Sequence, residues 1–238
     1  MSHFFITGTD TNIGKTYVSL CMLRYFNQRG YSTIGMKPLA SGCIRKNNIL
    51  YNEDALALYD ASSIQLEYNQ INPFAFEPAI APHIAAEQVG VKLTAASIVE
   101  KIHYALHFPA DIHLIEGVGG WLAPLNDRET MADVVLHCQL PVIMVVGMRV
   151  GCLNHALLTY QAIMNSGANL VGWIANFYDP TIVAADKIIA TLNAWLKIPC
   201  LSIIAYQQKI YEPLIIDVSP DENACTVPSF NFNNKWPC

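Results

Sequence analysis

The chain has 238 residues, of which 53% are hydrophobic and 14% are charged, and its net charge is −5. This composition is typical of a compact globular protein and excludes a disordered chain. The acidic balance and the lack of a basic stripe argue against nucleic acid as a partner. The longest apolar runs, such as "LPVIMVVGM" at 140–148, are too short to span a membrane, so no membrane association is expected.

The cysteines and the first residues bear on the compartment. Seven scattered cysteines without a Cys-x-x-Cys pair argue against a disulfide framework or a structural zinc site. The chain enters a strand-like run at His3 without a basic segment or a cleavage site, so no signal peptide is expected. Free thiols in a reducing compartment predict a cytoplasmic protein.

The first predicted strand, "HFFIT", leads into the loop "GTDTNIGKT" and then a helix. A strict phosphate-binding loop has its first glycine at position 9, but this chain has it one residue earlier, at Gly8. Gly8 and Gly14 still allow backbone N–H groups to approach phosphate oxygens, and the following helix directs its positive end there. Lys15 supplies a cation for the phosphates and Thr16 a hydroxyl for Mg²⁺. We interpret the stretch as a phosphate-binding loop; the alternative is a tight turn before an ordinary helix.

Short apolar runs alternate with helical patterns along the whole chain. The predicted strands cover 3–7, 32–37, 112–116, 141–147, 170–176 and 200–206. Most are apolar throughout, which is typical of parallel strands covered on both faces. Helical stripes follow the loop, up to a stop at Gly30, and occupy 153–164 and 182–195. The alternation predicts one P-loop NTPase-like α/β domain over 1–238, with a mostly parallel sheet, helices on both faces and an irregular C-terminal segment at 207–238.

Ligands of such folds lie at the carboxyl ends of the strands, where three charged residues are expected. Lys37 closes the second strand and needs an anionic partner if it is buried, although a surface lysine fits equally well. Asp54 opens a helical segment and, by itself, fits a helix N-terminal acid better than a metal ligand. Glu116 ends the buried strand "IHLIE" before a glycine-rich turn; its carboxylate is typical of a magnesium ligand, with a helix cap as the alternative.

The segment "VGCLNHALLT" at 150–159 opens a later helix. Gly151 and Asn154 lie at its start, where free N–H groups suit a carboxylate or a phosphate. From the residues alone, a plain Asn cap is the simpler interpretation.

Taken in this order, the motifs resemble the dethiobiotin synthetase family. The matching segments, which cover residues 4 to about 176, are "FFITGTDTNIGKT", "GMKPLASG", "NEDALAL", "NPFAFEPAIAPHIAAE", "LIEGVGGWLAPL", "ADVV", "LPVIMVVG", "GCLNHALLT" and "GWIAN". The resemblance implies a homodimeric, ATP- and Mg²⁺-dependent ligase of biotin biosynthesis. It implies that 7,8-diaminopelargonate (7,8-diaminononanoate), CO₂ and ATP become dethiobiotin, ADP and phosphate. A carbamate and a carbamic–phosphoric anhydride are the implied intermediates.

The resemblance also implies roles for individual residues. The implied catalytic residues are Lys37, Lys15 and Thr11. The implied substrate-binding residues are Ser41, Gly151, Cys152, Leu153 and Asn154, the last four holding the substrate carboxylate from the partner subunit. The implied nucleotide-binding residues are Asn12, Ile13, Gly14, Lys15, Thr16, Tyr17, Asp54, Glu116, Gly117, Val118, Gly119 and Asn176, with Asn176 at the adenine. The implied Mg²⁺ ligands are Thr16, Asp54 and Glu116.

Two departures from the family pattern stand out. Familiar members often carry Glu where this chain has Asn12, so the loop loses a charge beside the triphosphate, and altered kinetics are expected without loss of activity. After the last strand, the text "LSIIAYQQKIYEP" lacks the usual "GxIP"-like turn that helps to frame the adenine.

Three other functions fit parts of the pattern. A related P-loop kinase or ligase acting on another small acid would keep the loop and Glu116 but would not need the segment 151–154. A partitioning-type ATPase usually carries a further lysine early in the loop, and "TGTDTNI" has none. A degenerate paralogue that binds nucleotide without turnover is the third alternative.

Overall fold

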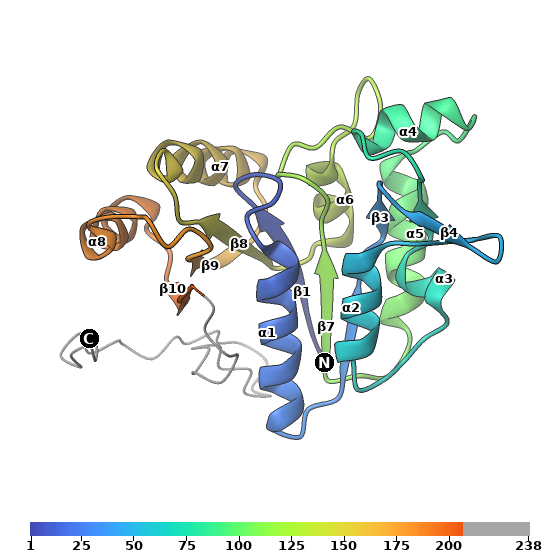
Figure 1. Cartoon of the computed structure of the whole chain (residues 1–238), viewed down its shortest axis with the longest axis horizontal. Coiled ribbons are helices and arrows are strands. Elements are labelled where there is room, and N and C mark those ends of the chain that lie inside the picture. Colours follow the sequence, from blue (N-terminus) through green and yellow to red (C-terminus); the bar gives the residue numbers. More distant parts are fainter. Residues whose placement is uncertain (207–238) are drawn as a thin grey trace.

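The computed structural model describes residues 1–206, and the segment expected to be irregular at 207–238 lies outside these residues. A six-stranded sheet forms the centre, in the order β10-β9-β8-β1-β7-β2 (Figure 1). The strands of this sheet are β1 (Ser2–Gly8), β2 (Thr33–Met36), β7 (Ile112–Glu116), β8 (Val142–Gly147), β9 (Leu170–Asn176) and β10 (Cys200–Ile204). Every neighbouring pair is parallel, which confirms the predicted α/β fold.

Helices follow the strands as crossover connections. They are α1 (Lys15–Gln28), α2 (Glu53–Ala61), α3 (Tyr68–Ile71), α4 (Pro82–Gln88), α5 (Ala95–Leu106), α6 (Met131–Cys138), α7 (Cys152–Ser166) and α8 (Ala185–Leu196). Two small sheets lie beside the main one: β3 (Leu39–Ala40) pairs with β6 (Phe74–Ala75), and β4 (Ile44–Lys46) pairs with β5 (Ile49–Tyr51). None of the helices in residues 1–206 combines the length and hydropathy that a bilayer crossing needs.

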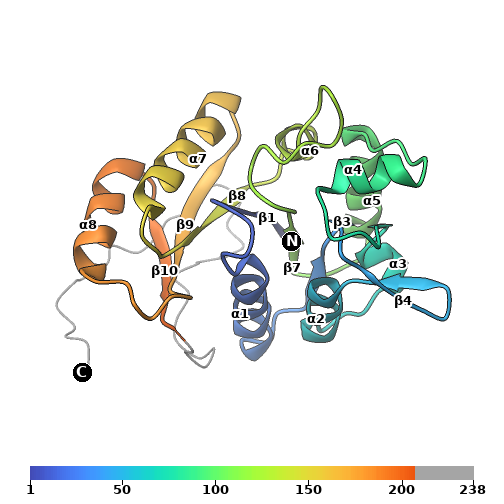
Figure 2. The ribbon, with the colours of Figure 1, turned by 45° about the horizontal axis from the view of Figure 1, so that its top comes forward.

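The sheet is covered on both faces, as its apolar strands predict. Side chains alternate between the two faces of a strand, and in β1 Phe4 and Ile6 belong to one buried cluster while Phe5 belongs to another. The first cluster includes the apolar stripe of α1, and the second includes residues of α5, α6, α7 and α8. Figure 2 shows α1 and α2 side by side, with α6 and α7 on the other side of the sheet. Two hydrophobic layers therefore hold the strand ends rigidly in place.

The sequence predicted the main strands and three of the helices closely. In α7, Leu153, Leu157 and Tyr160 of the predicted stripe pack against the core, and only Met164 does not. In α7 the fully buried residues are Cys152, Ala156 and Ile163, whereas Met164 of the predicted stripe is 47% exposed. Met164 is left on the exposed side of α7, next to the buried Ile163. In α8, the helix begins at Ala185, after Ile182 of the predicted pattern.

Candidate active site

The loop between β1 and α1 folds back over the end of its own strand. A Cβ atom at position 8 would lie 2.7 Å from Ile13 Cδ1 and 3.0 Å from Lys15 Cγ and Cδ, so a larger residue would have to displace both side chains. Gly14 has a φ of 83° and caps α1, and the N–H of Val18 donates to its carbonyl at 3.0 Å. Gly8 therefore lets the side chains of Ile13 and Lys15 pack closely against the start of the loop.

Lys15 lies inside the loop. It is 7% exposed, and its ammonium donates to the main-chain oxygen of Asp10 at 2.8 Å. Burial is the main cause that lowers the pKa of Lys15 to about 8; Glu116 opposes this shift and Lys37 adds to it. A cation held inside the loop is the arrangement that phosphate-binding loops use for the outer phosphates of a nucleotide.

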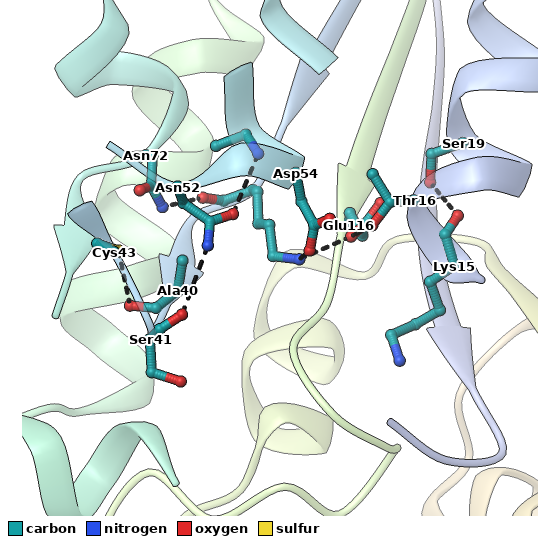
Figure 3. A network of polar contacts seen from close by, with 12 residues as sticks. Lys15, Thr16, Ser19, Ala40, Ser41, Cys43, Asn52, Asp54, Asn72 and Glu116 are labelled. Carbon is teal, nitrogen blue, oxygen red and sulfur yellow. Dashed lines mark hydrogen bonds and ion pairs between the residues drawn. The ribbon is translucent and has the colours of Figure 1, made fainter. Parts of the chain in front are cut away.

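A cluster of charges lies beside the loop and is drawn in Figure 3. The ammonium of Lys37 contacts the carboxylates of both Asp54 and Glu116, at 2.9 Å from Glu116 Oε1. The same Glu116 oxygen accepts a hydrogen bond from Thr16 Oγ1 at 2.8 Å. Burial alone lowers the pKa of Lys37, but the two carboxylates outweigh burial, and its pKa is raised above the ordinary value. The structure thus brings together Thr16, Lys37, Asp54 and Glu116 from the ends of four different elements, α1, β2, α2 and β7.

The cluster has the chemistry of a magnesium site. Glu116 is 1% exposed, and its second oxygen, Oε2, is buried without a hydrogen-bond partner in the described part of the chain. No cluster of three or more His, Cys, Asp or Glu side chains suited to a metal occurs within residues 1–206. Mg²⁺ needs no such cluster, because one or two carboxylates with phosphate and water oxygens suffice. Thr16, Asp54 and Glu116 therefore fit an ion that enters with a nucleotide.

The glycine run after β7 lies against the loop. A Cβ atom at position 117 would lie 2.6 Å from Phe5 Cζ, and Gly119 has a φ of 61°. A Cβ atom on Gly119 would lie 3.8 Å from Thr11 Oγ1, which places the run beside the exposed tip of the loop. Val118 is half-buried between these glycines. Residues 117–119 therefore present mainly backbone groups to the loop, because two of the three have no side chain.

Asn176 ends β9 and supports the loop from below. It is 2% exposed, and its Nδ2 donates to the main-chain oxygen of Ile13 at 2.7 Å. A Cβ atom on Gly14 would lie 2.2 Å from the same Nδ2. In this structure the amide of Asn176 is thus bonded to the loop, a contact that the sequence does not predict. Tyr17 lies half-buried in the first turn of the following helix.

Asn12, the residue that departs from the family pattern, has a backbone conformation in which asparagine is common. Its φ is 59°, in the left-handed region, where Asn is far more frequent than most residues with a side chain. Asn12 is exposed at the loop tip. The substitution therefore exchanges a charge for a residue better suited to the local backbone.

The segment 151–154 forms the start of α7. Gly151, with a φ of 90°, is the N-cap, and no side chain caps the helix, so a plain Asn cap at Asn154 is wrong. Gly151 and Asn154 are exposed, Leu153 is half-buried and Cys152 is buried. The described contacts join this segment to the loop, because Arg149 Nη2 lies 2.9 Å from Asp10 Oδ2. Asp10 Oδ1 also accepts from the N–H of Thr11 at 2.8 Å.

Several supporting residues escaped the sequence analysis. Arg149 and Asp10 lie in loops without hydrophobic periodicity. Only their contact in the folded structure identifies them as a pair. Ser41, predicted to bind substrate, is half-buried, and its main-chain oxygen accepts from Asn52 Nδ2 at 3.4 Å. Asn52 directly precedes the helix that carries Asp54. The sequence indicates a helix cap at this position, but it does not indicate the contact with Ser41.

The fold and the loop together define a P-loop nucleotide-binding protein. Among solved structures, the chain resembles the cell division protein FtsY of Thermotoga maritima, with a TM-score of 0.53 and 14% identity over 87% of this chain and 62% of that one. It also resembles a ParA family ATPase of Chlorobium tepidum, with a TM-score of 0.52 and 14% identity over 87% of this chain and 84% of that one. At this identity the likeness shows the fold alone.

Sequence relatives identify the family. A family model described as an AAA domain matches residues 2–213. The chain is 48% identical to the ATP-dependent dethiobiotin synthetase of Pseudomonas paraeruginosa over 201 residues, which cover 84% of this chain and 88% of that protein. It is 44% identical to the same enzyme of Pseudoalteromonas translucida over 220 residues, 90% of this chain and 97% of that protein. The chain belongs to the ATP-dependent dethiobiotin synthetase family.

The lowered pKa of Lys15 predicts how nucleotide affinity depends on pH. Below about pH 8 the ammonium is charged, and as the pH rises through about 8 the free protein loses this cation. The affinity for MgADP should therefore be constant near pH 7 and fall by up to about tenfold per pH unit above the pKa, because binding then takes up a proton. Calorimetric titration between pH 7 and pH 9.5 measures this dependence. Lys15→Arg is the control, because a guanidinium keeps its charge throughout; equal wild-type affinities across the range would contradict the assignment.

Proposed function

We propose that the protein catalyses the ATP-dependent closure of 7,8-diaminopelargonate and CO₂ to dethiobiotin, with release of ADP and phosphate. The observation that carries this proposal is the lysine of the second strand, Lys37, held between Asp54 and Glu116 beside a phosphate-binding loop. Family membership supplies the reaction, and the cluster supplies a place where two anions, a carbamate and a phosphoryl group, can meet.

We infer that Mg²⁺ is bound with ATP by Thr16, Asp54 and Glu116. The buried, unpartnered Oε2 of Glu116 supports this inference, since an ionised carboxylate oxygen buried without a partner is costly. When bound, the ion neutralises charge on the phosphate oxygens. Asp54 is suited to an exchangeable role because its side chain is 45% exposed and can turn between Lys37 and the ion.

The chemistry needs positioned cations more than a reactive side chain. One amine of the substrate forms an N–C bond to CO₂ and loses a proton, which gives an anionic carbamate. A carbamate oxygen then takes the γ-phosphoryl group of ATP, and the bond to ADP breaks. Lys37 and Lys15 neutralise the two approaching anions, and Thr11 lies at the loop tip above them. The second amine attacks the carbamoyl carbon, phosphate leaves, and the cyclic urea is closed.

The nucleotide and substrate sites extend the cluster in two directions. The loop residues Asn12, Ile13, Gly14 and Tyr17, with the glycine run that contains Gly117, Val118 and Gly119, line the phosphates, and Asn176 contacts the adenine. Ser41 binds the diamine. The N-terminus of α7, formed by Gly151, Cys152, Leu153 and Asn154, binds the substrate carboxylate, for which its free N–H groups are suited.

We infer a homodimer in which that helix terminus serves the active site of the partner subunit. Two features support this inference. The segment has no described contact with the Lys37 cluster of its own chain, and α7 leaves apolar side chains at its margin, with Leu158 58% and Met164 47% exposed. Apolar surface of this kind is typical of a helix that packs against another protein. A cytoplasmic location is also inferred; the free thiols of the five described cysteines are compatible with it.

Product formation tests the proposed reaction. Purified protein with MgATP and bicarbonate should release phosphate only when 7,8-diaminopelargonate is added, and dethiobiotin should appear in equal amount by mass spectrometry. Lys37→Met should lower the rate by a factor of about 10³ or more, because it removes the cation that neutralises the reacting anions. Lys46→Met, at an exposed lysine of β4, is the matched control and should retain wild-type activity. Phosphate release without the diamine would indicate another acceptor, and bound ATP without turnover would indicate a degenerate paralogue.

Mixing two inactive variants tests the shared site. Asn154→Asp places a negative charge where the substrate carboxylate binds and should abolish activity at low diamine concentration, as Lys37→Met does. If the helix terminus acts across the interface, a mixed dimer contains one intact site, and equal mixing after reversible dissociation should restore about one quarter of the wild-type sites. If both groups act within one chain, the mixture should stay inactive, and the shared site would be refuted.

A further inference from the structure

The main chain of Lys37 is held on both sides by the end of the short helix α3. Its N–H donates to the carbonyl of Ile71 at 3.0 Å, and its own carbonyl accepts from Asn72 Nδ2 at 2.7 Å. Lys37 lies just beyond the end of β2, where the ladder of the main sheet no longer holds the backbone. The position of its ammonium therefore depends on α3 and on the side chain that follows it.

The hydroxyl of Tyr68 joins this support to the helix that carries Asp54. It donates to Asn72 Oδ1 at 3.3 Å and accepts from the main-chain N–H of Asn52 at 2.8 Å. Asn52 in turn caps α2, because its Oδ1 accepts from the N–H of Ala55 at 3.1 Å. Asp54 lies in the first turn of that helix. The Tyr68 hydroxyl thus connects Asn72, which holds the backbone of Lys37, with Asn52, which caps the helix of Asp54.

The hydrogen bonds around the Tyr68 hydroxyl are formed with buried residues, which favours a rigid network. Asn72 is 3% and Asn52 is 8% exposed, and Figure 3 shows both beside the charged cluster. Burial is the main cause that raises the pKa of Tyr68, so its hydroxyl keeps the proton that it donates. The ring packs against Tyr51, with 4.7 Å between the ring centroids. The network also reaches Ser41 through Asn52 Nδ2.

We propose that Tyr68 is a positioning residue, whose hydroxyl, through Asn72 and Asn52, aligns Lys37 with Asp54 for the reaction. The proposal rests on the proposed function, since it is the alignment of the catalytic lysine that matters. Small displacements of a catalytic group have large effects on rate and small effects on ground-state binding. Tyr68 should therefore affect the chemical step more than the binding of nucleotide.

Tyr68→Phe tests the proposal, because it removes only the hydroxyl and keeps the ring against Tyr51. We expect kcat for dethiobiotin formation to fall about tenfold while KM for MgATP changes less than about twofold. Tyr104→Phe is the matched control: Tyr104 is 52% exposed, and its hydroxyl accepts from Gln70 Nε2 on the same helix α3 at 3.1 Å. The control should keep wild-type kcat. A folded Tyr68→Phe protein with kcat within about twofold of wild type would overturn the proposal.

A second readout needs no substrate and separates this proposal from the proposed reaction. A Lys37 side chain that is held less firmly is reached more often by a reagent, so brief acetylation at one fixed pH should label Lys37 about threefold faster in Tyr68→Phe. Exposed Lys46 is the internal reference in the same sample. Asn72→Ser breaks the network from its other end and should give the same changes if Tyr68→Phe does not fold. Unchanged labelling in both variants would refute the alignment, whereas wild-type protein that makes no dethiobiotin would refute the reaction alone.

Discussion

The contact between Lys37 and Glu116 is the interaction on which the rest of the site depends. Both side chains are almost fully buried, at 8% and 1% exposure. A buried charge is costly alone, and removing one partner of a buried pair typically costs about 3–5 kcal/mol. Each of the two charges therefore stabilises the other in its buried position. In the pair, Glu116 Oε2 has no hydrogen-bond partner among residues 1–206, and the pKa of Lys37 is raised, so its amine keeps its charge despite burial. The fold thus holds opposite charges close together before any ligand arrives.

The strand order explains how these charges meet. β7 lies between β1 and β2, and in the register Glu116 is opposite Ile6 while Ile115 is opposite Met36. The residues that follow β1 and β2 therefore flank Glu116, with Thr16 reaching it from α1 and Lys37 from the end of β2. A parallel sheet delivers all three carboxyl ends to one edge, which is why such sheets bind ligands there.

The sequence predicted the parts whose signal is local or periodic. Strands covered on both faces are apolar throughout, and Lys37 and Glu116 stand at their ends, so the sheet and its charged edge could be derived. The supporting contacts could not. Tyr68 lies in a four-residue helix without periodicity. Its partner Asn72 is nearby in the chain, but Asn52 is 16 residues away, so only the folded structure joins both of them to the lysine. Arg149 and Asp10 are 139 residues apart, and no pattern pairs them.

The most direct test of this account is the titration of the Lys37 ammonium itself. Lysine labelled with ¹⁵N gives a signal for each side-chain nitrogen, and Lys37→Arg assigns the one of interest. The account predicts a pKa above the ordinary lysine value of 10.5 in the free protein. It also predicts that Glu116→Gln lowers this pKa, because desolvation is then less opposed. A Lys37 amine that is already neutral at pH 9 in the wild-type protein would contradict the account, because the two carboxylates would then not hold Lys37 in its charged form.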